Sequence, residues 1–281
     1  MKLSFTTLGC PDWTLDELLK RAPGYGFDGI DFRFLKGTTE LWRLPEFTSE
    51  LSQTVRLLGE AGLAVTGLSS SVRVHTADVA AAQSACDELS RMVELAHGLG
   101  APLVRVFPGN SPEVALEGGL LSEMQEQLSR YAAIGAEAGV GIAVETHDGC
   151  SGGAQIKRLL DAAGHPTGVY SLWDIHHPLR HCGETPQDTA VFLRETLGYV
   201  HWKDSRLLPG GDAVLPNRDH LCLPGEGDLP MPAFIDALRE IGYDGAIAFE
   251  WEKPWVPDLP PAEIAFPRFV ESMRMLLAAP V

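Results

Sequence analysis

The chain has 281 residues, 45% of them apolar and 29 of them glycine, which is long enough to bury one large hydrophobic core. Its formal net charge of −16 disfavours a nucleic-acid partner and an anionic membrane surface, since both would be repelled. The five cysteines form no C-x-x-C pair and no apolar run approaches about 18 residues, which argues against a disulfide framework, a thiolate zinc site and a membrane span. We therefore expect a cytoplasmic protein without a nucleic-acid or membrane partner, and the sequence leaves a homo-oligomer open.

Strand-like and helical patterns alternate along the whole chain. Short apolar runs predict strands at 2–7, 28–34, 63–69, 102–107, 141–146, 169–174, 198–202 and 245–250. Amphipathic patterns predict helices at 14–22, 48–61, 78–99, 121–139, 152–163, 187–197, 231–241 and 262–277. Eight such alternations predict an α/β fold, a (β/α)8 TIM barrel formed by a single domain over residues 1–281.

Residues with capping chemistry lie at the ends of several predicted helices. Thr14 is followed by Glu17, and Thr48 by Glu50, which predicts a helix start at each threonine. Glycine readily takes the left-handed conformation that ends a helix, and glycines precede several of the next strands, at Gly62, Gly100, Gly139 and Gly242. These short helix-to-strand turns are typical of the bottom of a barrel.

The longest strand-to-helix connection runs from about 203 to 230. It combines charged residues with apolar ones, so we predict an ordered lid over the top of the barrel rather than a disordered loop. Arg206 lies in it and could bond substrate hydroxyls or a carboxylate. A solvated loop arginine is an equally good interpretation.

Four consecutive buried-type strands each end in a potential metal ligand. They are Glu145, Asp174, His201 and Glu250, at intervals of 29, 27 and 49 residues. Because the carboxyl ends of barrel strands meet at one face, these side chains should converge. Three carboxylates and one imidazole suit one divalent ion of the kind of Mn²⁺, Mg²⁺ or Co²⁺ better than Zn²⁺ in tetrahedral coordination. Such an ion would lower the pKa of a hydroxyl that it binds.

Other polar side chains should reach the same face. The two-residue period of a strand aligns His147, Lys203 and Glu252 with the ligands that precede them. His177 follows Asp174 by three residues, and we expect it to fold over the opening from a loop. For His147 and Lys203 a structural role is as good an interpretation as contact with substrate. Trp13 follows a strand end and could wall a sugar pocket, although most tryptophans at such positions belong to the core.

The order of these motifs resembles the xylose isomerase-like TIM-barrel superfamily of sugar isomerases and epimerases. The residues that carry the resemblance are Glu145, Asp174-x-x-His177, His201-x-Lys203-Asp204, Pro224-Gly-Glu-Gly-Asp228 and Gly242-Tyr-Asp-Gly245…Glu250. Phe27-Asp-Gly-Ile-Asp-Phe-Arg33 also looks like the second strand of that family. The resemblance to its ketose 3-epimerase branch implies that Glu145, Asp174, His201 and Glu250 bind the metal. It further implies that the two glutamates are the acid and base, and that His177 and Arg206 hold substrate oxygens.

The leading hypothesis is a metal-dependent isomerase or epimerase of a small polyhydroxy carbonyl compound. Glu145 or Glu250 would remove a proton beside the carbonyl, and an enediolate would form. In a close alternative, a dehydratase of the inosose type, the same enediolate expels a β-hydroxyl group. The sequence does not choose between these outcomes or identify the substrate.

Two other classes of protein are weaker matches. A sugar-binding barrel without activity would have no need of two opposed glutamates. Endonuclease IV shares this barrel but uses extra zinc-binding histidines on its third and fourth strands. Here those strands end in Gly67-Leu-Ser-Ser-Ser71 and Arg105-Val-Phe-Pro-Gly109, without histidine, so a role in DNA repair is disfavoured.

Overall fold

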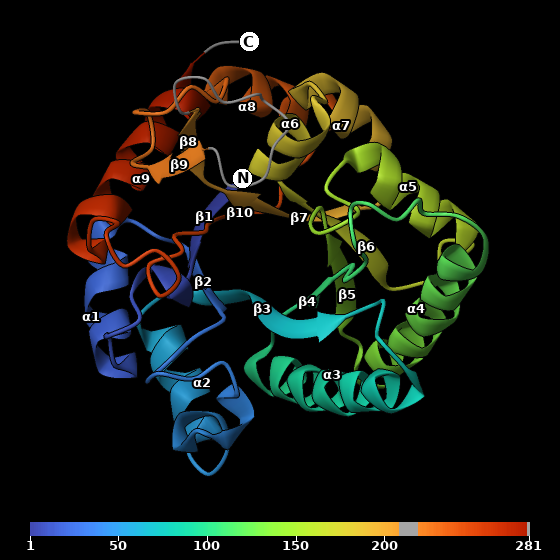
Figure 1. Ribbon diagram of the computed structural model, residues 1–281. Coiled ribbons are helices and arrows are strands. Elements are labelled where there is room, and N and C mark those ends of the chain that lie inside the picture. The colour runs from blue at the N-terminus through green and yellow to red at the C-terminus, as the bar shows by residue number, and fades with distance from the viewer. Residues whose placement is uncertain (208–218, 280–281) are drawn as a thin grey trace.

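A computed structural model describes residues 1–207 and 219–279 of the chain. Eight parallel strands close into a barrel in the order β1-β10-β7-β6-β5-β4-β3-β2, which Figure 1 shows along its axis. The strands are β1 (Lys2–Thr6), β2 (Gly29–Phe32), β3 (Ala64–Arg73), β4 (Leu103–Phe107), β5 (Gly141–Glu145), β6 (Val169–Asp174), β7 (Leu197–Trp202) and β10 (Ala246–Phe249). The predicted TIM barrel is therefore confirmed.

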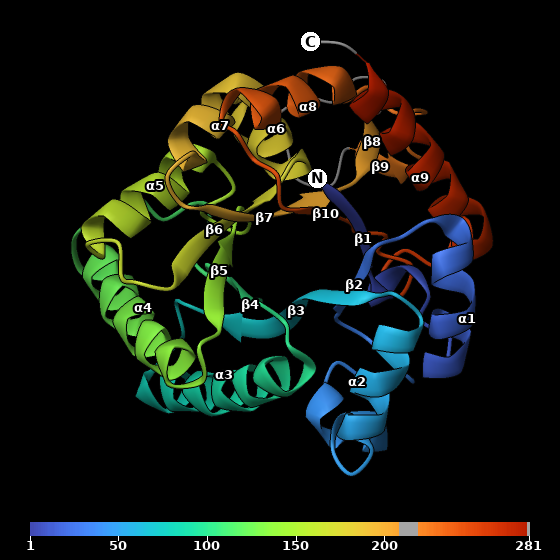
Figure 2. The same cartoon turned by 180° about the vertical axis from the view of Figure 1, so that it is seen from behind.

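Helices surround the barrel in both Figure 1 and Figure 2. They are α1 (Leu15–Tyr25), α2 (Leu51–Glu60), α3 (Val79–Leu99), α4 (Gly118–Ala138), α5 (Gly153–Ala162), α7 (Pro186–Leu193), α8 (Met231–Glu240) and α9 (Ala262–Ala278). Among the described residues, no helix is long and apolar enough to cross a membrane. The main hydrophobic core lies where these helices pack on the outer face of the strands.

The predicted helix ends are confirmed in most cases. Thr14 and Glu17 form a complete capping box, with Thr14 N donating to Glu17 Oε2 at 2.9 Å. The start predicted at Thr48 is wrong, because a 3₁₀ turn (Pro45–Phe47) precedes α2 and Thr48 Oγ1 donates to Leu44 O instead. The predicted glycine ends all have positive φ, from 68° to 73°, at Gly62, Gly100, Gly139 and Gly242.

Two elements at the top of the barrel differ from the predictions. The segment after Asp174 is not a loop but a short helix, α6 (His176–Cys182), in whose first turn His176 N donates to Asp174 Oδ1 at 2.9 Å. The long connection contains a hairpin of β8 (Asp204–Leu207) and β9 (Asp219–Cys222). The lid hypothesis also covers residues 208–218, which lie outside the described residues.

The inside of the barrel is built in layers. A small buried apolar cluster fills its lower part, formed by Leu103, Ala143, Leu172, Tyr199 and Ala248. Two residues further along the same five strands come a charged or polar set on the same face, namely Arg105, Glu145, Asp174, His201 and Glu250. Because side chains on one face of a strand recur every two residues, an apolar layer lies directly below the polar site.

Candidate active site

The four predicted ligands come together at the top of the barrel. One ligating atom from each of Glu145, Asp174, His201 and Glu250 lies within 4.8 Å of the others, and all four residues are at most 5% exposed. They come from the ends of β5, β6 and β7 and from the residue that follows β10. Convergence of carboxyl-terminal strand ends explains the cluster, as the sequence predicts.

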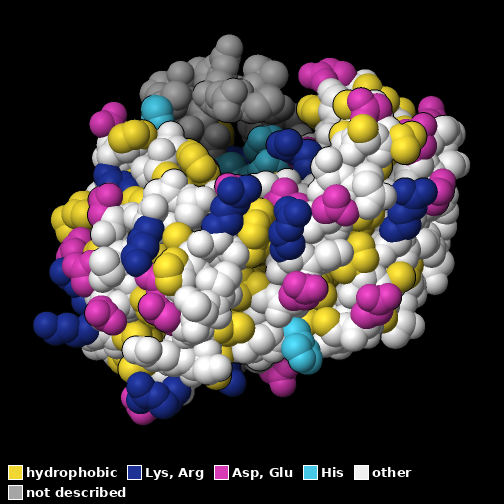
Figure 3. Space-filling view, turned by 90° about the horizontal axis from the view of Figure 1, so that it is seen from below, with side chains coloured by type: hydrophobic (Ala, Val, Ile, Leu, Met, Phe, Trp, Pro, Cys, Tyr) yellow, Lys and Arg dark blue, Asp and Glu magenta, His cyan; other side chains and the backbone are white. Residues whose placement is uncertain are grey.

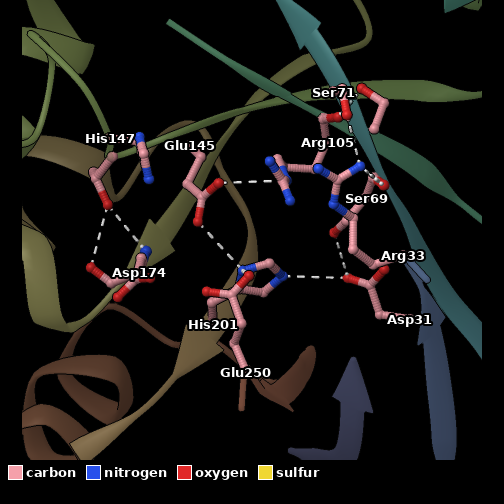
Figure 4. A network of polar contacts seen from close by, with 12 residues as sticks. Asp31, Arg33, Ser69, Ser71, Arg105, Glu145, His147, Asp174, His201 and Glu250 are labelled. Atoms are coloured by element: carbon pink, nitrogen blue, oxygen red, sulfur yellow. Dashed lines mark hydrogen bonds and ion pairs between the residues drawn. The ribbon is translucent and has the colours of Figure 1, made fainter. Parts of the chain in front are cut away.

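His201 is held between three carboxylates. Its Nδ1 lies 3.4 Å from both Glu145 Oε1 and Glu250 Oε1, and its Nε2 lies 3.2 Å from Asp31 Oδ2. Ser69 Oγ donates to the same Asp31 oxygen at 3.0 Å. Asp31 therefore favours a proton on Nε2, which turns the lone pair of Nδ1 toward the two glutamates. Figure 4 shows His201 joined to Glu145 on one side and Asp31 on the other.

The donor set fits a divalent cation. Glu145 Oε2, Asp174 Oδ2 and His201 Nδ1 are buried atoms that make no hydrogen bond to any described residue. Leaving a buried polar atom without a hydrogen-bond partner costs free energy, and coordination of an ion is one way to satisfy it. Three carboxylates and one imidazole nitrogen also match the ligand preference of hard divalent ions.

Lys203 lies among the acidic side chains. Its Nζ is 2.8 Å from Asp174 Oδ2, 2.5 Å from Glu250 Oε2 and 2.7 Å from Glu252 Oε1. The contact with Asp174 is an ion pair without hydrogen-bond alignment, so that oxygen stays available to a cation. Burial lowers the pKa of Lys203, but Asp174 and the two glutamates outweigh it and hold the pKa well above its ordinary value. Lys203 thus pairs with two of the metal-ligand candidates and with Glu252.

Both glutamates are ionised at neutral pH. Burial alone would raise the pKa of Glu145, but the charges of Arg105 and His201 lower it below its ordinary value. Burial also opposes ionisation of Glu250, yet Lys203 and His201 hold its pKa well below the ordinary value. Each carboxylate can therefore accept a proton.

Two histidines extend the site over β5 and α6. His177 Nδ1 lies 2.6 Å from the carbonyl oxygen of Thr146, which leaves its Nε2 as an acceptor. Burial and the nearby charge of His147 hold the pKa of His177 well below its ordinary value, so the ring is neutral. His147 Nδ1 lies 2.8 Å from Asp148 Oδ1, and the His147 and His177 rings are 4.7 Å apart. On the face in Figure 3, histidine side chains lie in a hollow beside basic ones.

The structure does not bring Arg206 or Trp13 to the cluster. Arg206 is exposed on β8 and its Nη2 donates to Glu226 O. Trp13 is 6% exposed, stacks on Tyr25 and packs edge-on against Phe266. Neither residue lines the cavity beside the ligands. Trp13 thus packs among core aromatic rings, and its predicted contact with a sugar stays a prediction.

A cavity of about 110 Å³ opens beside two of the candidate ligands, Glu145 and Glu250. It is lined by Leu8, Arg33, Arg105, Phe107, Glu145, His147, Glu250, Glu252 and Trp255. Sequence reasoning missed Asp31, Arg33 and Arg105. Asp31 and Arg33 alternate at the end of the second strand, and Arg105 pairs in register with Ala143, two residues before Glu145 on the neighbouring strand.

Comparison with known proteins gives the same fold. The chain is 18% identical to the IOLI protein, whose crystal structure has a bound zinc atom, with a TM-score of 0.79 over 99% of this chain and 96% of that one. It is 19% identical to the probable 3-DHS dehydratase AsbF of Bacillus anthracis, with a TM-score of 0.79 over 100% of both chains. It is 17% identical to D-allulose 3-epimerase from Methylomonas sp., with a TM-score of 0.74 over 98% of both chains.

Such low identities show a shared fold and nothing finer. A family model gives the more specific result, since the model described as the xylose isomerase-like TIM barrel matches residues 19–276. That match covers most of the chain, including every residue of the acidic cluster. The chain therefore belongs to the xylose isomerase-like TIM-barrel family.

Proposed function

We propose that this protein is a divalent-metal-dependent isomerase or epimerase of a small polyhydroxy carbonyl compound. The observation that carries the proposal is the cluster of Glu145, Asp174, His201 and Glu250, whose ligating atoms lie within 4.8 Å of one another. Three of these residues keep a buried polar atom without a hydrogen bond to any described residue, as a cation site requires. The family match and the similarity to a D-allulose 3-epimerase support the same class of reaction.

Two ionised glutamates supply the proton transfers. The metal, when bound, polarises the substrate carbonyl. One of Glu145 and Glu250 takes the proton from the adjacent carbon, which leaves an enediolate and a protonated glutamate. The other takes up a proton from solvent and delivers it to carbon, and the first then releases its proton to solvent. Both glutamates face His201 Nδ1 at 3.4 Å from different strands, so they can approach a substrate from different sides. Return to the opposite face inverts the stereocentre, and return to the neighbouring carbon exchanges aldose and ketose.

A dehydratase is the second candidate, supported by the similarity to the probable 3-DHS dehydratase. The first proton transfer is the same, but the enediolate then expels a β-hydroxyl group. Neutral His177 and protonated Lys203 lie beside the cluster, and Lys203 could donate the proton that the leaving hydroxyl needs. The two candidates are distinguished by whether the product has lost water.

The ion is proposed to be Mn²⁺, Mg²⁺ or Co²⁺ because oxygen ligands predominate. Because the IOLI structure contains a zinc atom, Zn²⁺ must be tested beside these three ions. Metal analysis of purified protein, followed by activity with each ion, identifies it. We propose a cytoplasmic enzyme with a small molecule as its ligand.

The test follows the carbon-bound proton. Metal-loaded protein is incubated in D₂O with a panel of ketoses, aldoses and inososes, and NMR records exchange and product. Glu145→Gln and Glu250→Gln should each lower exchange about 10²–10⁴-fold, since a positioned base contributes that much. Glu94→Gln, on the exposed face of α3, is the matched control. Exchange at the wild-type rate in both metal-loaded variants would rule out this mechanism.

A further inference from the structure

Two buried arginines line the same small cavity as the glutamates. Arg33 follows β2 and is 7% exposed, and Arg105 lies in β4 and is 1% exposed. Figure 4 shows the two guanidinium groups next to each other, with Glu145 beyond Arg105. Buried like charges repel, so their pairing near a cavity calls for a nearby anion.

Arg105 has donors without acceptors. Its Nε and Nη1 are buried and make no hydrogen bond to any described residue. Its nearest acidic atom is Glu145 Oε2, 3.3 Å from Nε but not aligned as a hydrogen bond. The guanidinium lies over the Phe107 ring, 3.8 Å from the centroid, which fixes its plane. A guanidinium has five N–H donors, so most of its capacity is open to a ligand.

Arg33 has no carboxylate partner among the described residues. Its Nη1 donates to Ser71 Oγ at 2.9 Å and faces Ser69 O at 3.5 Å, and both acceptors are neutral. Burial and the charge of Arg105 lower the pKa of Arg33 to about 10, so it remains protonated at neutral pH. A role in positioning Glu145 can account for Arg105. It cannot account for a second buried cation beside it.

Apart from Glu145, which lies 3.3 Å from Arg105, the acids of the site contact other positively charged or hydrogen-bonding groups. Glu250 and Glu252 contact Lys203, Asp174 contacts Lys203, and Asp31 faces His201. The cavity between the arginines and these acids therefore offers two positive groups and open donors to whatever enters it. This is the arrangement that recognises a planar anion through paired N–H···O bonds.

We propose that the substrate carries a carboxylate group, which Arg33 and Arg105 bind together, so that the enzyme acts on a polyhydroxy carbonyl acid rather than a neutral sugar. This inference rests on the proposed function for the reacting part of the molecule. A carboxylate fits better than a phosphate, since Glu145, Glu250 and Glu252 line the same cavity of about 110 Å³. A larger group with a charge near −2 would be repelled more strongly by them.

The test compares acids with their neutral counterparts by calorimetric binding to metal-loaded protein. The first pair is 2-keto-D-gluconate and D-fructose, and the second is D-glucuronate and D-glucose, in which a carboxylate replaces one CH₂OH group. D-fructose 6-phosphate tests whether the site prefers a phosphate group to a carboxylate. Wild-type protein should bind at least one acid about tenfold or more tightly than its neutral partner, because charge-assisted hydrogen bonds are strong.

Arg33→Gln and Arg105→Gln should each bring the ratio of the two affinities close to one. Arg73→Gln should keep the wild-type ratio, since Arg73 is an exposed arginine at the end of β3 that does not line this cavity. Circular dichroism and thermal unfolding check that each variant is folded. If Arg105→Gln does not fold, the affinity ratio of Arg33→Gln alone tests the proposal. The Arg33 side chain donates only to neutral acceptors, so its replacement should disturb the fold less.

Three results would overturn the proposal: no preference for either acid in wild-type protein, tighter binding of the phosphate than of both acids, or an unchanged preference in Arg33→Gln. Binding is measured without turnover, so the outcome is separate from that of the proposed reaction. Proton exchange on neutral sugars alone would refute the carboxylate and leave the reaction standing. A preference for acids without any proton exchange would support the carboxylate and refute the proposed reaction.

Discussion

The histidine at the centre of the cluster depends on a residue from a distant strand. Asp31 Oδ2 lies 3.2 Å from His201 Nε2, although 170 residues separate them. A carboxylate behind a ligating histidine fixes its tautomer and raises its basicity, and loss of such a partner typically lowers metal affinity about 10–100-fold. We expect Asp31→Asn to weaken metal binding by that factor in a metal titration. Asp16→Asn, an exposed change on α1, is the control, and equal affinities in both variants would contradict the role of Asp31.

The same carboxylates that favour a metal also favour a proton on His201. Burial lowers the pKa of His201, but the charge of Glu250, the hydrogen bond to Asp31 and the nearby Glu145 carboxylate outweigh it and raise the pKa well above its ordinary value. A metal at Nδ1 must displace that proton, so metal affinity should rise with pH as long as pH stays below this raised pKa. Calorimetry in two buffers with different ionisation enthalpies should show proton release on metal binding. Affinity that is independent of pH, without release of a proton, would show that His201 is not a ligand.

The hairpin of β8 and β9 explains a sequence motif in structural terms. Asp204 Oδ2 accepts from Gly225 N at 2.9 Å and from Gly227 N at 3.0 Å, and its Oδ1 accepts from Ser205 N at 2.8 Å. Asp228 in turn accepts from Leu207 N and pairs with Arg180 of α6. The Pro224–Asp228 segment, one of the motifs that carry the family resemblance, therefore anchors the hairpin beside α6.

This anchoring leaves no room for a side chain at Gly227. A Cβ atom there would overlap Asp204 Oδ1 and the backbone oxygen of Ser205. We expect Gly227→Ala to lower the free energy of unfolding by about 1–3 kcal/mol, the usual cost of overpacking. Gly24→Ala in α1 is the control, because its Cβ meets nothing within 4 Å and alanine favours a helix. Denaturant unfolding measures both, and equal stability of the two variants would contradict this packing.

The elements that sequence reasoning missed are those without a local signal. Strands and long helices have a hydrophobic period, and their order gave the barrel and the convergence of the four ligands. Helix α6 has only seven residues, too short to form on its own, so contacts such as Asp174 Oδ1 with His176 N stabilise it. Arg33 and Arg105 were missed for another reason. A charged residue inside a strand gains meaning only when the register shows which neighbours it faces.

At the scale of the whole molecule, the barrel concentrates acidic groups in its buried upper layer. Glu145, Asp174 and Glu250 are each at most 5% exposed, so their mutual repulsion is poorly screened. A cation that binds only the folded state stabilises it by mass action, by about 2.7 kcal/mol at one hundred times its dissociation constant. We expect added Mn²⁺ to raise the thermal midpoint and chelation to lower it.

Asp174→Asn is the control for this effect, since an amide replaces an anionic oxygen at the proposed ion. The variant should show little or no shift with Mn²⁺, and its metal stoichiometry should fall. A shift of the wild-type size in Asp174→Asn would place the stabilising ion elsewhere on the chain.

The strand that precedes the last ligand is also the strand that closes the barrel. β10 pairs with β7 on one side and with β1 on the other, and Glu250 follows it directly. Completion of the ligand set and closure of the ring are therefore a single event for a growing chain. A nascent chain that has not yet emerged past residue 250 has neither a finished barrel nor a finished metal site. A chain that still lacks Glu250 would therefore offer the proposed ion an incomplete set of ligands.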